Sequence, residues 1–300
     1  MDYFKNTTLA KSSISLLNRQ LHIWLEFFPK HQQHITNILM FPDNAVKILN
    51  DNITTKSNTN LHIFYTAIIS LINHSTEFTS HIPPEQLKDI KIKWCDIRKT
   101  NQIPIIQRRL EQLPTEIQSQ KGGTQLKYDD IVKKRDSLPF GSIERLLLGF
   151  YTYLPPVRAD YYAIEIITFK QKPTQPNYIR RISPEESWVV LNDFKTKKSF
   201  KQIKNILPLE LNSEFIESLR INPRNYLFIN QTGDPFNRNS FVCWSNRILS
   251  RLFKTELTLT IIRHLFINTL DFQNTKLSDL KTISDKMGHD LSSQRIYKWF

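Results

Sequence analysis

Apolar residues recur at three- and four-residue steps in several parts of the chain, which is the spacing of amphipathic helices. In the first third of the sequence this spacing covers residues 8–28, 61–72 and, more weakly, 105–113, and a proline follows the first and the last of these stretches. The N-terminal third is therefore predicted to be all-helical.

The pattern changes beyond residue 142. Ser142 is placed to cap a helix that the Pro155–Pro156 pair would end. Three strand-like runs come next, at residues 162–169, 188–194 and 200–207, and the basic segment 195–198 forms a turn between the last two. Helical spacing then returns after Leu209, over residues 240–252, from about residue 260, over residues 278–287 before Gly288, and in a last helix through Tyr297.

These elements predict a mainly α fold with a small antiparallel β-sheet, an α+β class. Residues 118–124 hold two of only six glycines and no apolar residue, which is typical of an interdomain linker. We therefore expect a helical N-terminal domain over residues 1–120 and a second domain over residues 121–300.

The net charge of the chain indicates which kind of partner it binds. Forty-one Lys and Arg against 28 Asp and Glu give a formal net charge of +13. Residues 1–120 hold 13 basic against 10 acidic side chains and the rest holds 28 against 18, so the excess lies mainly in the second domain. Such a balance favours a polyanion, nucleic acid first, because each phosphate neutralised by Lys or Arg releases condensed counterions.

Two cysteines, Cys95 and Cys243, stand far apart and outside any CxxC or Cys/His cluster, so the sequence indicates neither a disulfide framework nor a zinc site. The N-terminus has no apolar signal-peptide core, and the most apolar run, residues 61–72, is too short to span a bilayer. We expect a soluble, intracellular protein without membrane contact.

Candidate chemistry appears near the end of the chain, where Gly288 and His289 are followed eight residues later by Tyr297. Arg263 stands earlier, and Arg158 follows the Pro155–Pro156 stop. Each of these residues alone is more often a surface arginine, a core histidine or a packed aromatic. As a set they suit attack on a phosphodiester, because the transition state gathers charge on non-bridging oxygens and a planar guanidinium meets that charge with two hydrogen bonds.

In order along the chain, Arg158, Lys195 on the predicted turn, Arg263, the Gly-His pair and Tyr297 resemble the signature of tyrosine recombinases, also called phage-type integrases. The resemblance covers roughly residues 124–299. The forms LPPVRADYY, LNDFKTKKSF and MGHDLSSQRIY are most similar to versions from large DNA viruses and virophages. The length and helical spacing of the first 120 residues suit the DNA-clamping core-binding domain usual in this family.

The resemblance implies a role for each residue. Tyr297 is the nucleophile that forms a 3′-phosphotyrosyl link, and Arg158 and Arg263 are the clamps on the phosphate. His289 donates a hydrogen bond to a phosphate oxygen or assists proton transfer from the tyrosine. Lys195 is the general acid for the leaving 5′ oxygen, favoured over Lys197 and Lys198, which stay open.

One position departs from the family pattern. Thr260 stands three residues before Arg263, where the family usually has histidine, and a hydroxyl can bind phosphate but carries no charge. We expect a supporting role for Thr260. His264 faces about 100° away from Arg263 on a helix and is expected to be structural.

The resemblance also implies double-stranded DNA as partner, a homo-tetramer on paired sites, and no metal, nucleotide or other cofactor, since the covalent link stores the bond energy. Integration of a viral or mobile genome is the expected setting, with excision or resolution of multimers as alternatives. The nucleus or a viral factory of an infected host cell are compartments that this setting allows.

Two other functions fit the same residues. A type IB topoisomerase shares the chemistry and rejoins the same strand, and an inactive descendant would only bind DNA. Three residues follow Tyr297, whereas family members usually carry a further segment that docks on a neighbouring subunit. Either the sequence ends early or its subunits couple elsewhere, and a last helix with so short a tail is expected to be loosely held until DNA binds.

Overall fold

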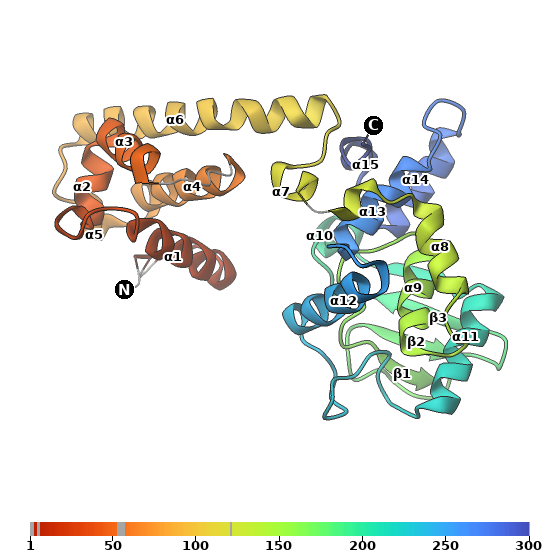
Figure 1. The fold of residues 1–300 in the computed structure, drawn as a ribbon. Helices are drawn as coiled ribbons and strands as arrows, with labels where there is room; N and C mark the ends of the chain where they lie inside the picture. The colour runs from red at the N-terminus through yellow and green to blue at the C-terminus, as the bar shows by residue number, and fades with distance from the viewer. Residues whose placement is uncertain (1–2, 5–6, 53–57, 121, 300) are drawn as a thin grey trace. The chain divides into compact units, whose positions relative to one another are not determined.

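The computed structural model describes residues 3–4, 7–52, 58–120 and 122–299, and these form a mainly helical protein with one small four-stranded sheet (Figure 1). The predicted fold class is confirmed in its helical character and its small sheet. The sheet is mixed, however, and the prediction that it is antiparallel throughout is wrong.

The chain divides into two compact units, Met1–Glu111 and Gln112–Phe300. The division falls before the segment 118–124 that was expected to be the linker. That segment belongs to the second unit, where α7 (Glu116–Ser119) is followed by the 3₁₀ turn η2 (Gly122–Gln125). Gly123 is buried, and a Cβ there would come within 2.7 Å of the Glu256 carbonyl oxygen. The two glycines of this segment therefore allow the backbone to pack closely against residues 255–257, and they do not serve to make the segment flexible.

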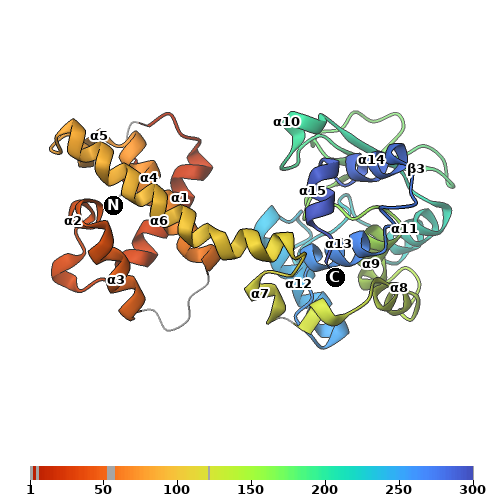
Figure 2. The same cartoon turned by 90° about the horizontal axis from the view of Figure 1, so that it is seen from above.

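The first unit is helical over its described residues, as predicted. Its helices are α1 (Lys11–Leu25), α2 (Ile35–Met40), α3 (Pro42–Asn52), α4 (Asn58–His74), α5 (Thr76–Thr79) and α6 (Pro84–Leu110), with the 3₁₀ turn η1 (Lys30–Gln32). Helix α4 packs against α1 and α6 (Figures 1 and 2). Trp94 of α6 is fully buried and donates from Nε1 to the Leu39 carbonyl, at 3.1 Å, which ties α6 to α2.

Four strands form the sheet of the second unit, in the order β1 (Glu165–Thr168), β2 (Tyr178–Arg181), β3 (Ser187–Leu191) and β4 (Ile203–Ile206). Strand β2 pairs in parallel with β1 and antiparallel with β3. The Glu165 carboxylate accepts hydrogen bonds from the backbone of Thr174 and Gln175, at 2.7 and 3.1 Å, and so fixes the loop that returns the chain to the start of β2. β2 itself was not predicted from the sequence.

Helices surround this sheet: α8 (Tyr128–Asp136), α9 (Ile143–Thr152), α11 (Leu209–Ile221), α12 (Arg238–Phe253), α13 (Leu259–Asn268), α14 (Leu277–Lys286) and α15 (Leu291–Ile296). The predicted cap on Ser142 is confirmed, since its Oγ accepts from Arg145 N at 3.3 Å. Thr258 caps α13 in the same way. Because α13 is buried on almost every face, any side chain in its middle lies inside the unit.

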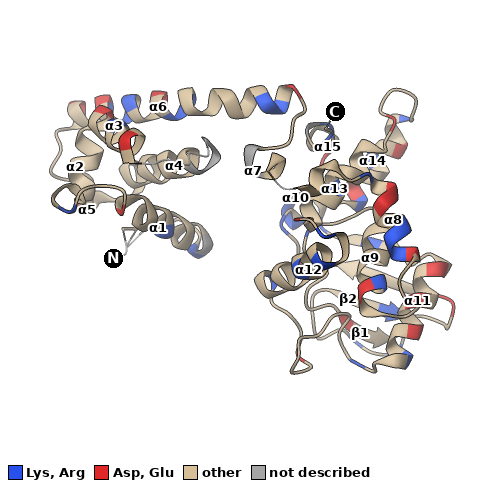
Figure 3. Ribbon diagram, in the orientation of Figure 1, with Lys and Arg blue, Asp and Glu red and all other residues tan. Residues whose placement is uncertain are grey.

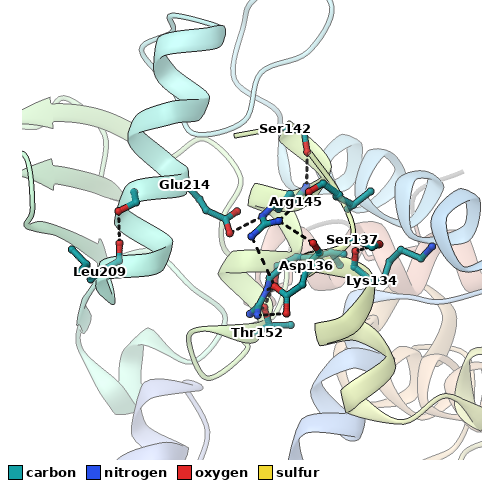
Figure 4. A network of polar contacts seen from close by, with 12 residues as sticks. Lys134, Asp136, Ser137, Ser142, Arg145, Thr152, Leu209 and Glu214 are labelled. Atoms are coloured by element: carbon teal, nitrogen blue, oxygen red, sulfur yellow. Dashed lines mark hydrogen bonds and ion pairs between the residues drawn. The ribbon is translucent and has the colours of Figure 1, made fainter. Parts of the chain in front are cut away.

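A polar network joins three helices of the second unit (Figure 4). Arg145 of α9 donates from Nε to Glu214 of α11, at 2.8 Å, and from Nη1 to the carbonyls of Asp136 and Leu138 at the end of α8, at 3.1 and 3.0 Å. Only 1% of the Glu214 side chain is exposed. A buried carboxylate needs such a partner, and the arginine in turn depends on the carboxylate.

Replacement of Glu214 by alanine is expected to destabilise the protein by about 3 kcal/mol, because it removes the closest counter-charge of a largely buried guanidinium and leaves it only Asp136, at 4.0 Å. Chemical denaturation with a two-state fit would measure the change. Arg220→Ala is the matched control, since it breaks the solvent-exposed Arg220–Glu217 pair on the same helix and should leave the transition in place. Equal effects of the two variants would contradict a stabilising role for the network.

Candidate active site

Arg263 lies at the centre of the residues predicted to act together. It is 1% exposed and sits in the middle of α13. Its Nη1 donates to the carbonyls of Pro156 and Met287, at 2.5 and 3.3 Å, and its Nη2 lies 2.9 Å from Nδ1 of His289. Pro156 precedes Arg158 by two residues and Met287 precedes His289 by two, so one guanidinium fastens two distant segments of the chain to α13.

Arg158 is presented by the chain that leaves α9. Its backbone carbonyl accepts a hydrogen bond from the buried Tyr151 hydroxyl, at 2.7 Å. Its side chain is half-buried, and Nη1 has a long contact of 3.4 Å with the Gly288 carbonyl. The backbone is therefore fixed, while most of the guanidinium's donors have no short contact within the part of the chain that the structure describes, which leaves them available to a ligand.

Gly288 forms the turn that joins α14 to His289. Its φ is +66°, a left-handed conformation that suits glycine. A Cβ there would also come within 3.0 Å of Ile203 in β4 and 3.4 Å of Phe194. The turn therefore packs closely against β4 and Phe194, and this packing fixes the backbone position of His289.

The contact with Arg263 sets the proton on His289. A guanidinium has only donors, so Nδ1 must accept and the neutral ring carries its proton on Nε2. His289 is 2% exposed, and burial, with Arg263 and Arg158 adding to it, lowers the pKa of His289 to about 3. At neutral pH the ring is thus an uncharged donor from Nε2.

The site has an excess of donors and positive charge. Burial, and then the nearby Arg158, lower the pKa of Arg263 to about 10, which still leaves it protonated at neutral pH. Among the described residues, no acceptor meets the buried Nε of Arg263 or Nε2 of His289. Two neighbouring guanidinium groups and an unpaired imidazole N–H suit an anion with several oxygens, such as a phosphodiester.

Tyr297 lies next to these groups. It is the C-cap residue that follows α15. It is half-buried, and its ring lies 5.7 Å from that of His289 in a stacked arrangement at 27°. The guanidinium carbon of Arg263 lies 5.7 Å from the centre of the same ring. The structure thus brings Arg158, Arg263, His289 and Tyr297 together in one place.

The predicted basic turn also reaches this place. Thr196 donates from Oγ1 to the Gly288 carbonyl, at 2.6 Å, and so fixes the segment that carries Lys195. Lys195 is exposed. Lys197 belongs to the short helix α10 (Lys197–Phe200), and its ion pair with Asp193, at 2.6 Å, raises the pKa of Lys197. Lys195 and Lys197 both flank the fixed threonine, and Lys197 is engaged in the ion pair with Asp193.

Thr260 is the second residue of α13 and is exposed. It stands one helical turn before Arg263, hence on the same face of the helix. Its hydroxyl has no hydrogen-bond partner among the described residues. It is therefore accessible to a ligand at the start of the helix.

Sequence reasoning missed the residues that support the site. Thr196 and Tyr151 hold the segments of Lys195 and Arg158, and the buried Asp160 pairs with Arg238 at 2.7 Å. These are contacts between side chains and distant backbone or helices, and no local spacing marks them. The sequence offered one hint of such a residue, the acidic Asp160 only two residues after Arg158.

Comparisons with known proteins found no matching family model and no curated protein of similar sequence. Among solved structures, the chain is similar to the XerA recombinase, with 13% identity and a TM-score of 0.43, over 95% of this chain and 94% of that one. It is also similar to the XerH site-specific recombinase bound to difH substrate in a pre-cleavage complex, with 15% identity and a TM-score of 0.42, over 96% and 94% of the two chains. The function proposed below rests on the geometry of the site.

Among the described residues, no group of three or more His, Cys, Asp and Glu side chains is arranged to hold a metal ion. No helix in the described ranges has the length and apolar character needed to cross a membrane. Cys95 and Cys243 are free thiols.

Proposed function

We propose that this chain is a tyrosine-type DNA strand transferase that cuts and rejoins DNA through a covalent 3′-phosphotyrosyl intermediate. The observation that carries the proposal is the position of Arg263, which joins the segments of Arg158 and His289 and lies beside the ring of Tyr297. A buried arginine with this set of neighbours has no simple packing role, since a hydrophobic residue would fill the space at lower cost.

In the proposed reaction the Tyr297 hydroxyl oxygen attacks phosphorus and loses its proton to water. The bond between phosphorus and the 5′ oxygen breaks, and Lys195 gives a proton to that oxygen. Arg158 and Arg263 hold the non-bridging oxygens, and His289 donates from Nε2. In this tautomer Nε2 cannot take the phenolic proton, so the proposal assigns His289 to oxygen binding and not to base catalysis.

The intermediate keeps the energy of the broken phosphodiester in the phosphotyrosyl bond, so a free 5′-hydroxyl can reverse the step without nucleotide hydrolysis. Double-stranded DNA is the proposed substrate, supported by the net charge of +13 and its concentration in the second unit. The first unit is proposed to hold the DNA, and a homo-tetramer on paired sites to exchange strands. Integration of a mobile or viral genome stays a prediction from the sequence resemblance.

A strand-exchange assay tests the proposal and separates it from the two alternatives. Duplexes with a random core, one pool carrying a fluorescent label and the other biotin, are incubated with the protein in EDTA, and sequencing identifies joined molecules. A recombinase yields products that carry both labels. A parallel incubation uses a supercoiled plasmid. Its relaxation without joined duplexes would indicate a topoisomerase, and retention of DNA without either product would indicate a binding protein.

A further inference from the structure

His264 connects α13 to the backbone of Tyr297. Its Nδ1 lies 2.6 Å from the Tyr297 carbonyl oxygen, and its ring centre lies 4.6 Å from that of the Tyr297 ring. His264 follows Arg263 directly, on another face of the same helix. One helix therefore holds both the anion-binding arginine and the chain that carries the candidate nucleophile.

The proton of His264 is determined by this contact. A carbonyl only accepts, so Nδ1 must donate and the proton of the neutral ring lies on Nδ1. His264 and His289 are thus expected to be opposite tautomers, since Nδ1 of His289 accepts from Arg263. Burial is the main reason that the pKa of His264 is lowered to about 4, so the ring is neutral at physiological pH.

Trp299 stacks on the His264 ring. The two rings stack with centres 3.8 Å apart and planes inclined by 13°. Trp299 is 7% exposed, and its backbone N–H donates to Asn268 of α13 at 2.8 Å. Tyr297 and Trp299 are therefore both fastened to α13 of the same chain. These contacts differ from the expectation that the last segment is loosely held.

We infer that His264 is a positioning residue for the Tyr297 nucleophile: it holds the Tyr297 backbone through the Nδ1 hydrogen bond, and Trp299 stacks on its ring to keep the donor in place. The inference rests on the proposed function. Tyr297 is the C-cap of a short helix, α15, and the His264 contact ties its carbonyl to the helix that carries Arg263. A misplacement of the attacking oxygen by about 1 Å is enough to lose roughly a hundredfold in rate.

Two substitutions separate the hydrogen bond from the packing. His264→Phe keeps a ring for Trp299 to stack on and removes the donor, whereas His264→Asn offers an amide N–H near the place of Nδ1 and removes the ring. Single-turnover formation of the covalent adduct on a nicked duplex, at saturating DNA, is expected to slow by about tenfold to a hundredfold in His264→Phe. His264→Asn is expected to react faster than His264→Phe although it packs less well.

A merely structural histidine would give the opposite order of rates, because phenylalanine fills the site better than asparagine.

A substrate with sulfur in place of the bridging 5′ oxygen adds a second readout, since its leaving group needs no proton. It should restore the rate of Lys195→Ala and leave His264→Phe slow. An adduct rate for His264→Phe equal to that of the unsubstituted protein, or lower for His264→Asn than for His264→Phe, would overturn the inference.

The tautomer can be read without any substitution. In protein labelled with ¹⁵N-histidine, long-range proton–nitrogen spectra at neutral pH are expected to show His264 protonated on Nδ1 and His289 protonated on Nε2. A proton on Nε2 of His264 would overturn the inference even if a variant failed to fold. Absence of any adduct with the unsubstituted protein would instead count against the proposed function, so the two failures are distinguishable.

Discussion

Arg263→Lys is expected to slow formation of the covalent adduct by roughly a hundredfold or more, which corresponds to about 3 kcal/mol of lost transition-state stabilisation. Lysine keeps the charge and has three donors on one atom, so it cannot reach the Pro156 and Met287 carbonyls, His289 and a phosphate together. Single-turnover rates at saturating DNA measure the loss apart from binding.

The same substitution should lower stability, because buried carbonyls that lose their donor cost about 1–3 kcal/mol each. Arg251→Lys is the matched control, since Arg251 is an arginine of α12 whose exposed side chain pairs with Glu144. It should leave both the rate and the thermal transition unchanged. A normal rate for Arg263→Lys would remove Arg263 from the chemistry and leave it a structural residue only.

Lys195→Ala is expected to slow cleavage of an ordinary duplex by about a hundredfold to ten-thousandfold, the usual range for the loss of a general acid. A duplex with a bridging 5′ sulfur should bring the rate back close to that of the unsubstituted protein, because a thiolate leaves without a proton. The comparison isolates proton transfer from phosphate binding, which a cation on a basic turn would also support.

Lys197→Ala and Lys198→Ala are the controls for this assignment. Lys197 of α10 is engaged in an ion pair with Asp193, and the threonine bound to the Gly288 carbonyl lies between Lys195 and Lys197. Both control variants should weaken DNA binding at most and show no selective rescue by the sulfur substrate. Rescue of Lys198→Ala and not of Lys195→Ala would move the general acid to Lys198.

Much of the site could be predicted because its residues stand in recognisable local settings. Arg263 lies among Ile261, Ile262 and Leu265, so its burial and its need for a partner follow from the sequence. Its partners do not follow, because they are carbonyls of two distant segments. Only the folded chain shows that the arginine joins those segments.

His264 shows the limit of a helical projection. The 100° step correctly separates it from Arg263 on the helix surface. The projection carries no information about what packs on the other face, and that face meets the carbonyl of Tyr297. A side chain that is remote from the reacting group along the helix can therefore still act on it through the backbone.

The elements that sequence patterns missed have physical explanations. Only Ile90 and Trp94 of α6 are buried, so the helix has little apolar periodicity to detect, and Pro104 suggests a break that does not occur. Strand β2 consists of four residues that end in two arginines, and its parallel pairing is accompanied by the Glu165 contacts with the loop between β1 and β2, which no local pattern reveals. The glycines at 122 and 123 suggested a linker because their use in close packing is not visible in the sequence.

The most direct test of the account is to identify the residue that becomes linked to DNA. Adducts formed on nicked random-core duplexes are isolated under denaturing conditions, digested with protease and nuclease, and sequenced by mass spectrometry. The predicted result is a single modified residue, Tyr297, joined to a 3′-phosphate, with no adduct from Tyr297→Phe protein that binds DNA normally. An adduct on another residue, or one that persists in Tyr297→Phe, would contradict the assignment of the active site.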